Sequence, residues 1–228
     1  MYFVTYENFF NKEEKENELI DETENNNIER VIAILNEANR VNITLNINKK
    51  EESGNYPLFL ACANNNLEIV QLLMNYANQK NITLILNDKE KEYGKNPLFL
   101  ACWKNNPEIV QLLMNYADQK NIILNLNDKD KNELYPLYWA CNKNNLEIVK
   151  SLMSYAHQKN ITLILNDKNK NGDYPLLWAC HNNNLEIVKL LVGYANEHNI
   201  KLDKSKINFE KLDQNIKNIL TEGNVKEN

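Results

Sequence analysis

The stretch that decides the fold is residues 56–74, which read YPLFLACANNNLEIVQLLM. The pattern returns three times, as NPLFLACWKNNPEIVQLLM at 96–114, YPLYWACNKNNLEIVKSLM at 135–153 and YPLLWACHNNNLEIVKLLV at 174–192. Successive copies are 39 or 40 residues apart. Such self-similarity indicates stacked supersecondary units, each of which buries its apolar face against its neighbours.

Each copy predicts two helices joined by a turn. Proline suits the first position of a helix, where its missing N–H needs no partner, so Pro57 predicts the start of a short helix. Asn66 stands where a side-chain oxygen would cap a second helix, and the carboxylate of Glu68 would oppose the positive end of its dipole. The equivalent residues are Pro97, Pro136 and Pro175 for the helix starts and Asn106, Asn145 and Asn184 for the caps.

The pattern Pro-Leu-x-x-Ala-Cys, followed by Asn-Leu-Glu-Ile-Val-x-x-Leu-Leu, resembles the ankyrin repeat over roughly residues 48–203. The resemblance implies an all-α, ankyrin-like helix–turn–helix solenoid. We expect four full repeats, at about 48–87, 88–126, 127–165 and 166–206. Residues 27–35 match the second-helix pattern, so 1–47 are expected to form a divergent N-terminal capping unit. Residues 207–228 are expected to form a C-terminal capping helix and tail.

The chain departs from that family in three ways. The family period is about 33 residues, so we expect extra turns on the second helix, followed by a short extended segment such as 82–85. The usual threonine before the proline is replaced, for example by Tyr56 and Asn96, which predicts aromatic packing in place of a polar link between repeats. The third repeat has Glu133 in place of the loop glycine, so the sequence does not predict whether this loop keeps the same turn.

Composition excludes several classes of protein. The 228 residues are 43% hydrophobic and 25% charged, which is typical of a folded globular chain. A net charge of −5 offers no global positive field for nucleic acid or an anionic membrane. Apolar runs are too short for a secretory signal or a membrane span, so we expect an intracellular, cytoplasmic monomer with reduced thiols. We interpret the 44 asparagines, which are regularly dispersed, as the bias of an A/T-rich genome.

The sequence contains residues that could suggest disulfides, calcium binding or histidine catalysis, but structural roles explain them better. The four cysteines share one repeat position, and packed helices lie about 8–10 Å apart, too far for disulfides. Residues 167–172 fit the first half of a calcium loop, but Trp178 stands where a bidentate glutamate is needed. The histidines His157, His181 and His198 share no register, and no catalytic motif accompanies them. We therefore expect no metal, no cofactor and no enzymatic activity.

In the resembled family, partners dock on a concave surface formed by loop tips and first helices. The residues at these surface positions differ from repeat to repeat, whereas the framework residues are nearly the same. Either a recognition surface or neutral drift would produce this contrast. The candidate contact residues are Glu52, Asn55, Ala63, Glu92, Tyr93, Lys95, Trp103, Lys104, Lys131, Leu134, Asn142, Lys143, Asp173 and His181.

Trp103 is the strongest candidate, because its counterparts Ala63, Asn142 and His181 show that packing demands no indole there. Trp139 and Trp178 replace framework leucines, so we expect them to pack instead.

The sequence thus predicts a non-catalytic scaffold that presents a concave surface to a protein partner. The alternative is a regulatory or effector subunit that acts through a short motif in residues 2–24 and uses its repeats for targeting.

Overall fold

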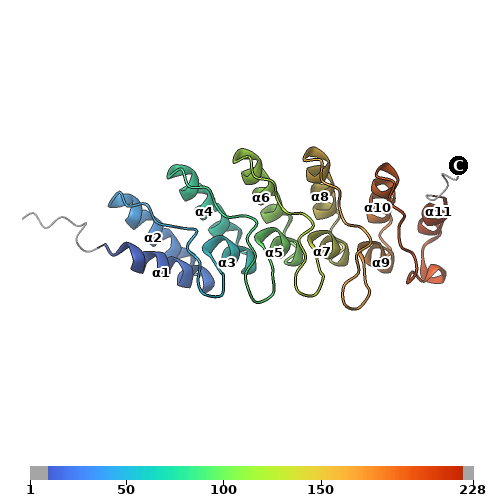
Figure 1. Cartoon of the computed structure of the whole chain (residues 1–228), viewed down its shortest axis with the longest axis horizontal. Coiled ribbons are helices and arrows are strands. Elements are labelled where there is room, and N and C mark those ends of the chain that lie inside the picture. Colours follow the sequence, from blue (N-terminus) through green and yellow to red (C-terminus); the bar gives the residue numbers. More distant parts are fainter. Residues whose placement is uncertain (1–9, 223–228) are drawn as a thin grey trace, which may run out of the picture.

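A computed structural model describes residues 10–222, and within them the helices form a single row of pairs (Figure 1). The first helix of each repeat has seven residues and the second has 13. The first helices are α3 (Pro57–Ala63), α5 (Pro97–Trp103), α7 (Pro136–Asn142) and α9 (Pro175–His181). The second helices are α4 (Leu67–Gln79), α6 (Pro107–Gln119), α8 (Leu146–Gln158) and α10 (Leu185–Glu197).

Each end of the row is covered by further helices. At the N-terminal end, α1 (Lys12–Glu24) packs against α2 (Ile28–Arg40) and α3. At the C-terminal end, a short 3₁₀ turn, η2 (Phe209–Lys211), leads into α11 (Gln214–Glu222), which packs on α10. The predicted all-α solenoid with capping units is confirmed.

The helix boundaries follow the residues that predicted them. Proline occupies the first turn of all four first helices. The Oδ1 atom of Asn66 accepts a hydrogen bond from the N–H of Ile69 at 2.9 Å, and the equivalent asparagines cap the other second helices in the same way. These side chains satisfy N–H groups that have no partner within the helix.

Asparagine also serves the two tight turns of each repeat. Of the eleven non-glycine residues with positive φ between 10 and 222, ten are asparagines, such as Asn65 before the cap of α4 and Asn81 after its end. Asparagine tolerates this left-handed conformation better than most residues do. Much of the asparagine enrichment therefore has a structural role that base composition alone does not provide.

The loop that contains Glu133 has the same backbone conformation as the glycine-containing loops of the other repeats. Gly54, Gly94 and Gly172 have φ values of 88°, 75° and 79°, and Glu133 takes φ 64° at the same place. The backbone turn is thus retained in a residue with a side chain.

The expected aromatic packing is present, with the rings of Tyr56 and Phe59 5.9 Å apart, but the expected loss of a polar link between repeats was wrong. Tyr56 is fully buried, yet its hydroxyl donates to the carbonyl oxygen of Asp88 in the next repeat at 3.0 Å. Tyr135 makes the equivalent bond to Asp167 at 3.1 Å. A phenol is long enough to fill the core and still reach a polar group at its edge.

The extra residues of each repeat form the end of the second helix and an irregular segment after it. In residues 82–86 burial alternates, with Leu84 and Leu86 in the core, as in an extended chain. The phenol of Tyr116, in the next repeat, accepts a hydrogen bond from the N–H of Leu84 at 3.1 Å and donates to the carbonyl of Ile82 at 3.2 Å. Tyr76, Tyr155 and Tyr194 hold the other segments in the same way.

An asparagine ladder joins these segments to one another. The side chain of Asn48 donates to the carbonyl of Thr83 at 2.8 Å and accepts from the N–H of Ile85 at 3.1 Å. Asn87, Asn127 and Asn166 repeat the pattern along the row. The polar backbone of an irregular segment is thereby paired without strand formation.

Candidate functional site

The first helices carry a series of large aromatic side chains at their surface. Trp139 and Trp178 stand at the fourth position of α7 and α9, while Trp103 and His181 end α5 and α9. Positions four and seven of a helix lie on one face, so the four side chains share a side of the row. All three tryptophans are half-buried and rest against the core. We call these four residues the aromatic strip.

The members of the strip are linked by ring contacts from α5 to α9. The ring centroids of Trp103 and Trp139 are 6.3 Å apart. The buried ring of Tyr138 meets both Trp139 and Trp178 edge-on, at 5.5 and 6.4 Å. Trp178 in turn meets His181 at 5.4 Å. These distances and tilted geometries are those that aromatic pairs prefer, so ring contacts run without a break from Trp103 to His181, through the buried ring of Tyr138.

Lysine ammonium groups lie over the rings of the strip. Lys95 Nζ is 4.5 Å from the centroid of the Trp103 ring and 4.5 Å from that of Tyr93. Lys104 Nζ lies 4.8 Å from Trp103, and Lys143 Nζ lies 5.5 Å from Trp139. Each cation is within the range of attraction to the face of an aromatic ring. The site is therefore both aromatic and basic.

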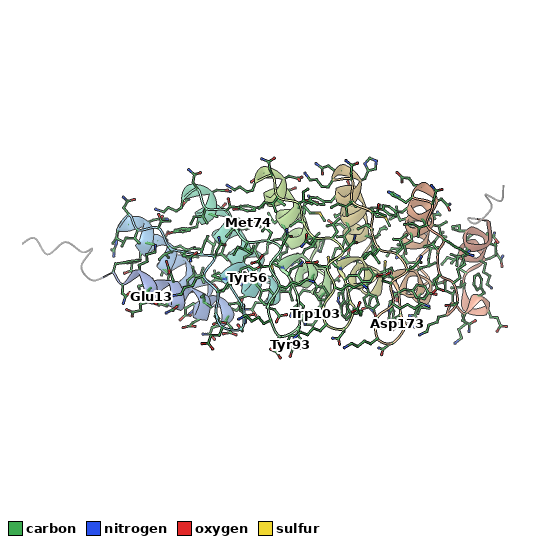
Figure 2. All side chains as sticks on the ribbon, viewed as in Figure 1. Glu13, Tyr56, Met74, Tyr93, Trp103 and Asp173 are labelled. Carbon is green, nitrogen blue, oxygen red and sulfur yellow. The ribbon has the colours of Figure 1, made fainter. Side chains whose placement is uncertain are left out.

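The loop beside Trp103 is held in shape by a buried carboxylate. Glu90 accepts hydrogen bonds from the backbone N–H groups of Glu92 at 2.6 Å and of Tyr93 and Lys95 at 2.9 Å. Tyr93 remains 48% exposed at the loop tip, where the neighbouring carboxylate of Glu92 raises the pKa of its hydroxyl. Figure 2 shows Tyr93 and Trp103 close to the edge of the row that carries the loops.

The structure brings eight of the predicted contact residues to this area. Tyr93, Lys95, Trp103 and Lys104 form one cluster of cation–π contacts. Asn142 and Lys143 lie at the end of α7, and His181 closes the strip. Glu92 is exposed beside the cluster.

The remaining candidates lie outside the strip or have structural contacts. Glu52 and Asn55 belong to the first loop, and Ala63 packs at the edge of the core. Leu134 packs against the core as well. Lys131 Nζ donates to the carbonyl of Lys91 at 2.9 Å, and an oxygen of Asp173 is 3.9 Å from Lys206 Nζ.

Trp139 and Trp178 rest against the core, as expected, but Trp139 also meets Trp103, with ring centroids 6.3 Å apart. Their counterparts Leu60 and Leu100 are buried, whereas the larger indoles emerge from the core. The available signal was size, because an indole at a leucine position exceeds the space that the framework provides there.

The cysteines have no reactive character. Cys62, Cys102, Cys141 and Cys180 are unpaired and buried. Burial raises the pKa of all four thiols, that of Cys180 to about 12. Between residues 10 and 222, no group of three or more His, Cys, Asp or Glu side chains could hold a metal ion. Asp167, in the calcium-like loop, pairs with Lys129 at 2.7 Å.

The structure describes only part of the N-terminal segment 2–24. Leu19 and Ile20 of α1 lie in the core, so the second half of the segment 2–24 belongs to the capping unit. Residues 2–9 of the proposed motif lie outside the described part of the chain.

Two-helix repeats in one row, joined by loops on the first-helix side, can be compared with known families. The family model for ankyrin repeats, in three copies, matches residues 19–123 and 120–204. The chain belongs to the ankyrin repeat family. No curated protein matches this ankyrin repeat chain significantly. Among its described helices, none is both long and apolar enough to cross a membrane.

Proposed function

We propose that this ankyrin repeat protein is a non-catalytic scaffold that binds a protein partner, as a monomer, on the concave face of its first helices and loops. Ankyrin repeats are in general protein–protein interaction modules. The observation that carries the proposal is the aromatic strip. Its three half-buried indoles sit at positions where other repeats of the same chain have leucine, alanine, asparagine or histidine.

Energetic arguments favour the strip as the contact region. Tryptophan and tyrosine dominate binding energy at protein interfaces, because they bury a large area while losing little conformational freedom. Trp103 has a partly exposed ring, an aromatic neighbour in Trp139 and flanking lysines, which are the properties of an interaction hot spot.

The test is substitution of Trp103→Ala, which gives the second repeat the residue that the first repeat has at this position. We expect the variant to lose partners that the wild-type protein captures from its source cells, while its melting temperature falls by only a few degrees. The matched control is Ile123→Thr, which removes a 58% exposed apolar side chain away from the strip and restores the residue found at Thr83 and Thr162. Capture that survives Trp103→Ala, or that is lost equally in the control, would refute the proposal.

A further inference from the structure

Two sets of lysines along the repeats differ in their partners. The first group forms an ion-pair ladder between successive repeats. Lys89 pairs with Asp128 at 3.5 Å, Lys129 with Asp167 at 2.7 Å and Lys168 with Asp203 at 2.6 Å. Lys50 and Asp88 begin the ladder. The charges of this first group are thus neutralised within the fold.

The second group comprises Lys95, Lys104 and Lys143 of the strip. Among the residues that the structure describes, none of these three ammonium groups has a carboxylate oxygen within 4.0 Å. Their contacts are instead the faces of Tyr93, Trp103 and Trp139. A cation over an aromatic ring keeps its charge and leaves its other side open to a further partner.

Four carboxylates around the strip already have structural contacts, so they do not pair with the three lysines of the strip. Glu90 and Asp130 are buried and accept backbone N–H groups of their own loops. Glu133 pairs with Lys129, and Asp173 lies near Lys206. The first helices α3, α5, α7 and α9 contain no acidic residue at all. Glu92, beside Tyr93, is exposed and forms no ion pair with the part of the chain that the structure describes.

We propose that the partner segment recognised by the strip is acidic, with carboxylates that pair with Lys95, Lys104 and Lys143 and apolar side chains that cover the indoles. This inference rests on the proposed function and names the chemistry of its partner. The strip is a local basic surface on a chain of net charge −5. An acidic peptide is attracted to that surface alone, whereas a long nucleic acid would also meet the repulsion of the remaining surface.

The aromatic strip offers its own reporter, since the three tryptophans of the chain all belong to it. Intrinsic tryptophan fluorescence can therefore be followed while the full-length protein is titrated with synthetic 12-residue peptides. The probe repeats Glu-Glu-Leu-Ser, and the matched peptides repeat Gln-Gln-Leu-Ser and Lys-Lys-Leu-Ser. A single-stranded oligonucleotide of similar length forms the fourth arm.

We expect the glutamate peptide to bind about tenfold more tightly than the glutamine peptide, and more weakly as salt is added. Lys95→Gln with Lys104→Gln should weaken binding about fivefold to tenfold. The control pair is Lys80→Gln with Lys120→Gln. These lysines also lie over tyrosine rings, at 5.9 and 5.6 Å, but end the second helices α4 and α6. Binding to the control pair should stay within about twofold of wild type, because no strip contact is lost.

Equal or tighter binding of the glutamine peptide, the lysine peptide or the oligonucleotide would overturn the acidic assignment. So would an unchanged affinity in the Lys95 and Lys104 variant, or no fluorescence response to any peptide. These failures are distinct from failure of the scaffold function. If capture from cells still depends on Trp103 while the peptides show no acidic preference, the strip binds a partner of different chemistry.

Discussion

Glu133 has the positive-φ backbone conformation that glycine has at the equivalent position of the other loops. Its φ of 64° lies in the left-handed region, which costs a residue with a Cβ atom about 1 kcal/mol or more relative to glycine. The side chain compensates in part, because Glu133 pairs with Lys129 at 2.9 Å. Half of that side chain is exposed, so the ion pair contributes only about 0.5 kcal/mol.

We therefore predict that Glu133→Gly raises the free energy of unfolding by about 0.5–1 kcal/mol. Urea denaturation followed by circular dichroism measures this change. Gly94→Ala is the converse substitution and should destabilise the protein by about 1 kcal/mol, because alanine must adopt φ near 75° there. A lower urea midpoint for Glu133→Gly would show that the side-chain contacts outweigh the backbone strain.

At the scale of the element, the unusual part of each repeat is the segment that follows its second helix. Residues 82–86 are neither helix nor strand, so their polar backbone groups depend on neighbouring repeats. Tyr116 pairs with the N–H of Leu84 and the carbonyl of Ile82, and Asn48 pairs with Thr83 and Ile85. The segment is thus held from two sides, by the asparagine that precedes the first loop and by the tyrosine of the next repeat.

We predict that Tyr116→Phe destabilises the protein by about 1–3 kcal/mol, because it leaves the buried N–H of Leu84 without an acceptor. The ring itself is retained, so the loss isolates the hydroxyl. Chemical denaturation provides the measurement, and hydrogen exchange of the Leu84 amide should accelerate in the variant.

The matched control is Tyr93→Phe, which removes an exposed hydroxyl and should change stability by less than about 0.5 kcal/mol. Equal effects of the two substitutions would mean that the phenol of Tyr116 contributes nothing beyond packing.

At the scale of the whole molecule, the same contacts recur along the row and make it respond to pH as a unit. Burial raises the pKa of Tyr56, Tyr135 and Tyr174, which link the loops. Burial likewise raises the pKa of the segment-holding phenols, Tyr76, Tyr116, Tyr155 and Tyr194. In the unfolded chain these groups titrate near the ordinary value of 10.0.

Stability from the buried phenols is therefore fully present below pH 10 and falls as the pH rises above it, because the unfolded chain then loses protons that the folded chain retains. We predict that alkaline titration yields phenolate absorbance and loss of helical circular dichroism in one coincident transition. Phenolate formation by the buried tyrosines while the helices persist would contradict this coupling.

The sequence supplied much of the fold because each helix boundary has a local cause. Pro57 and its equivalents start the first helices, and Asn66 and its equivalents cap the second. It could not show that Tyr56 keeps a polar link, because that bond reaches a carbonyl 32 residues away. The candidate site was predicted in part. The sequence singles out Trp103 by contrast with its counterparts and predicts that Trp139 packs, as it does, but it could not show that the two rings meet across 36 residues.

The order and nature of the helices in this ankyrin repeat protein were determined by the sequence alone, since capping, turn conformation and apolar spacing act over a few neighbouring residues. Tertiary structure decided which side chains share a surface and which charges are cancelled. Trp103 meets Trp139, and Lys129 meets Asp167, only because successive repeats stack in register. These two pairs are 36 and 38 positions apart in the sequence, a distance over which local propensities carry no information.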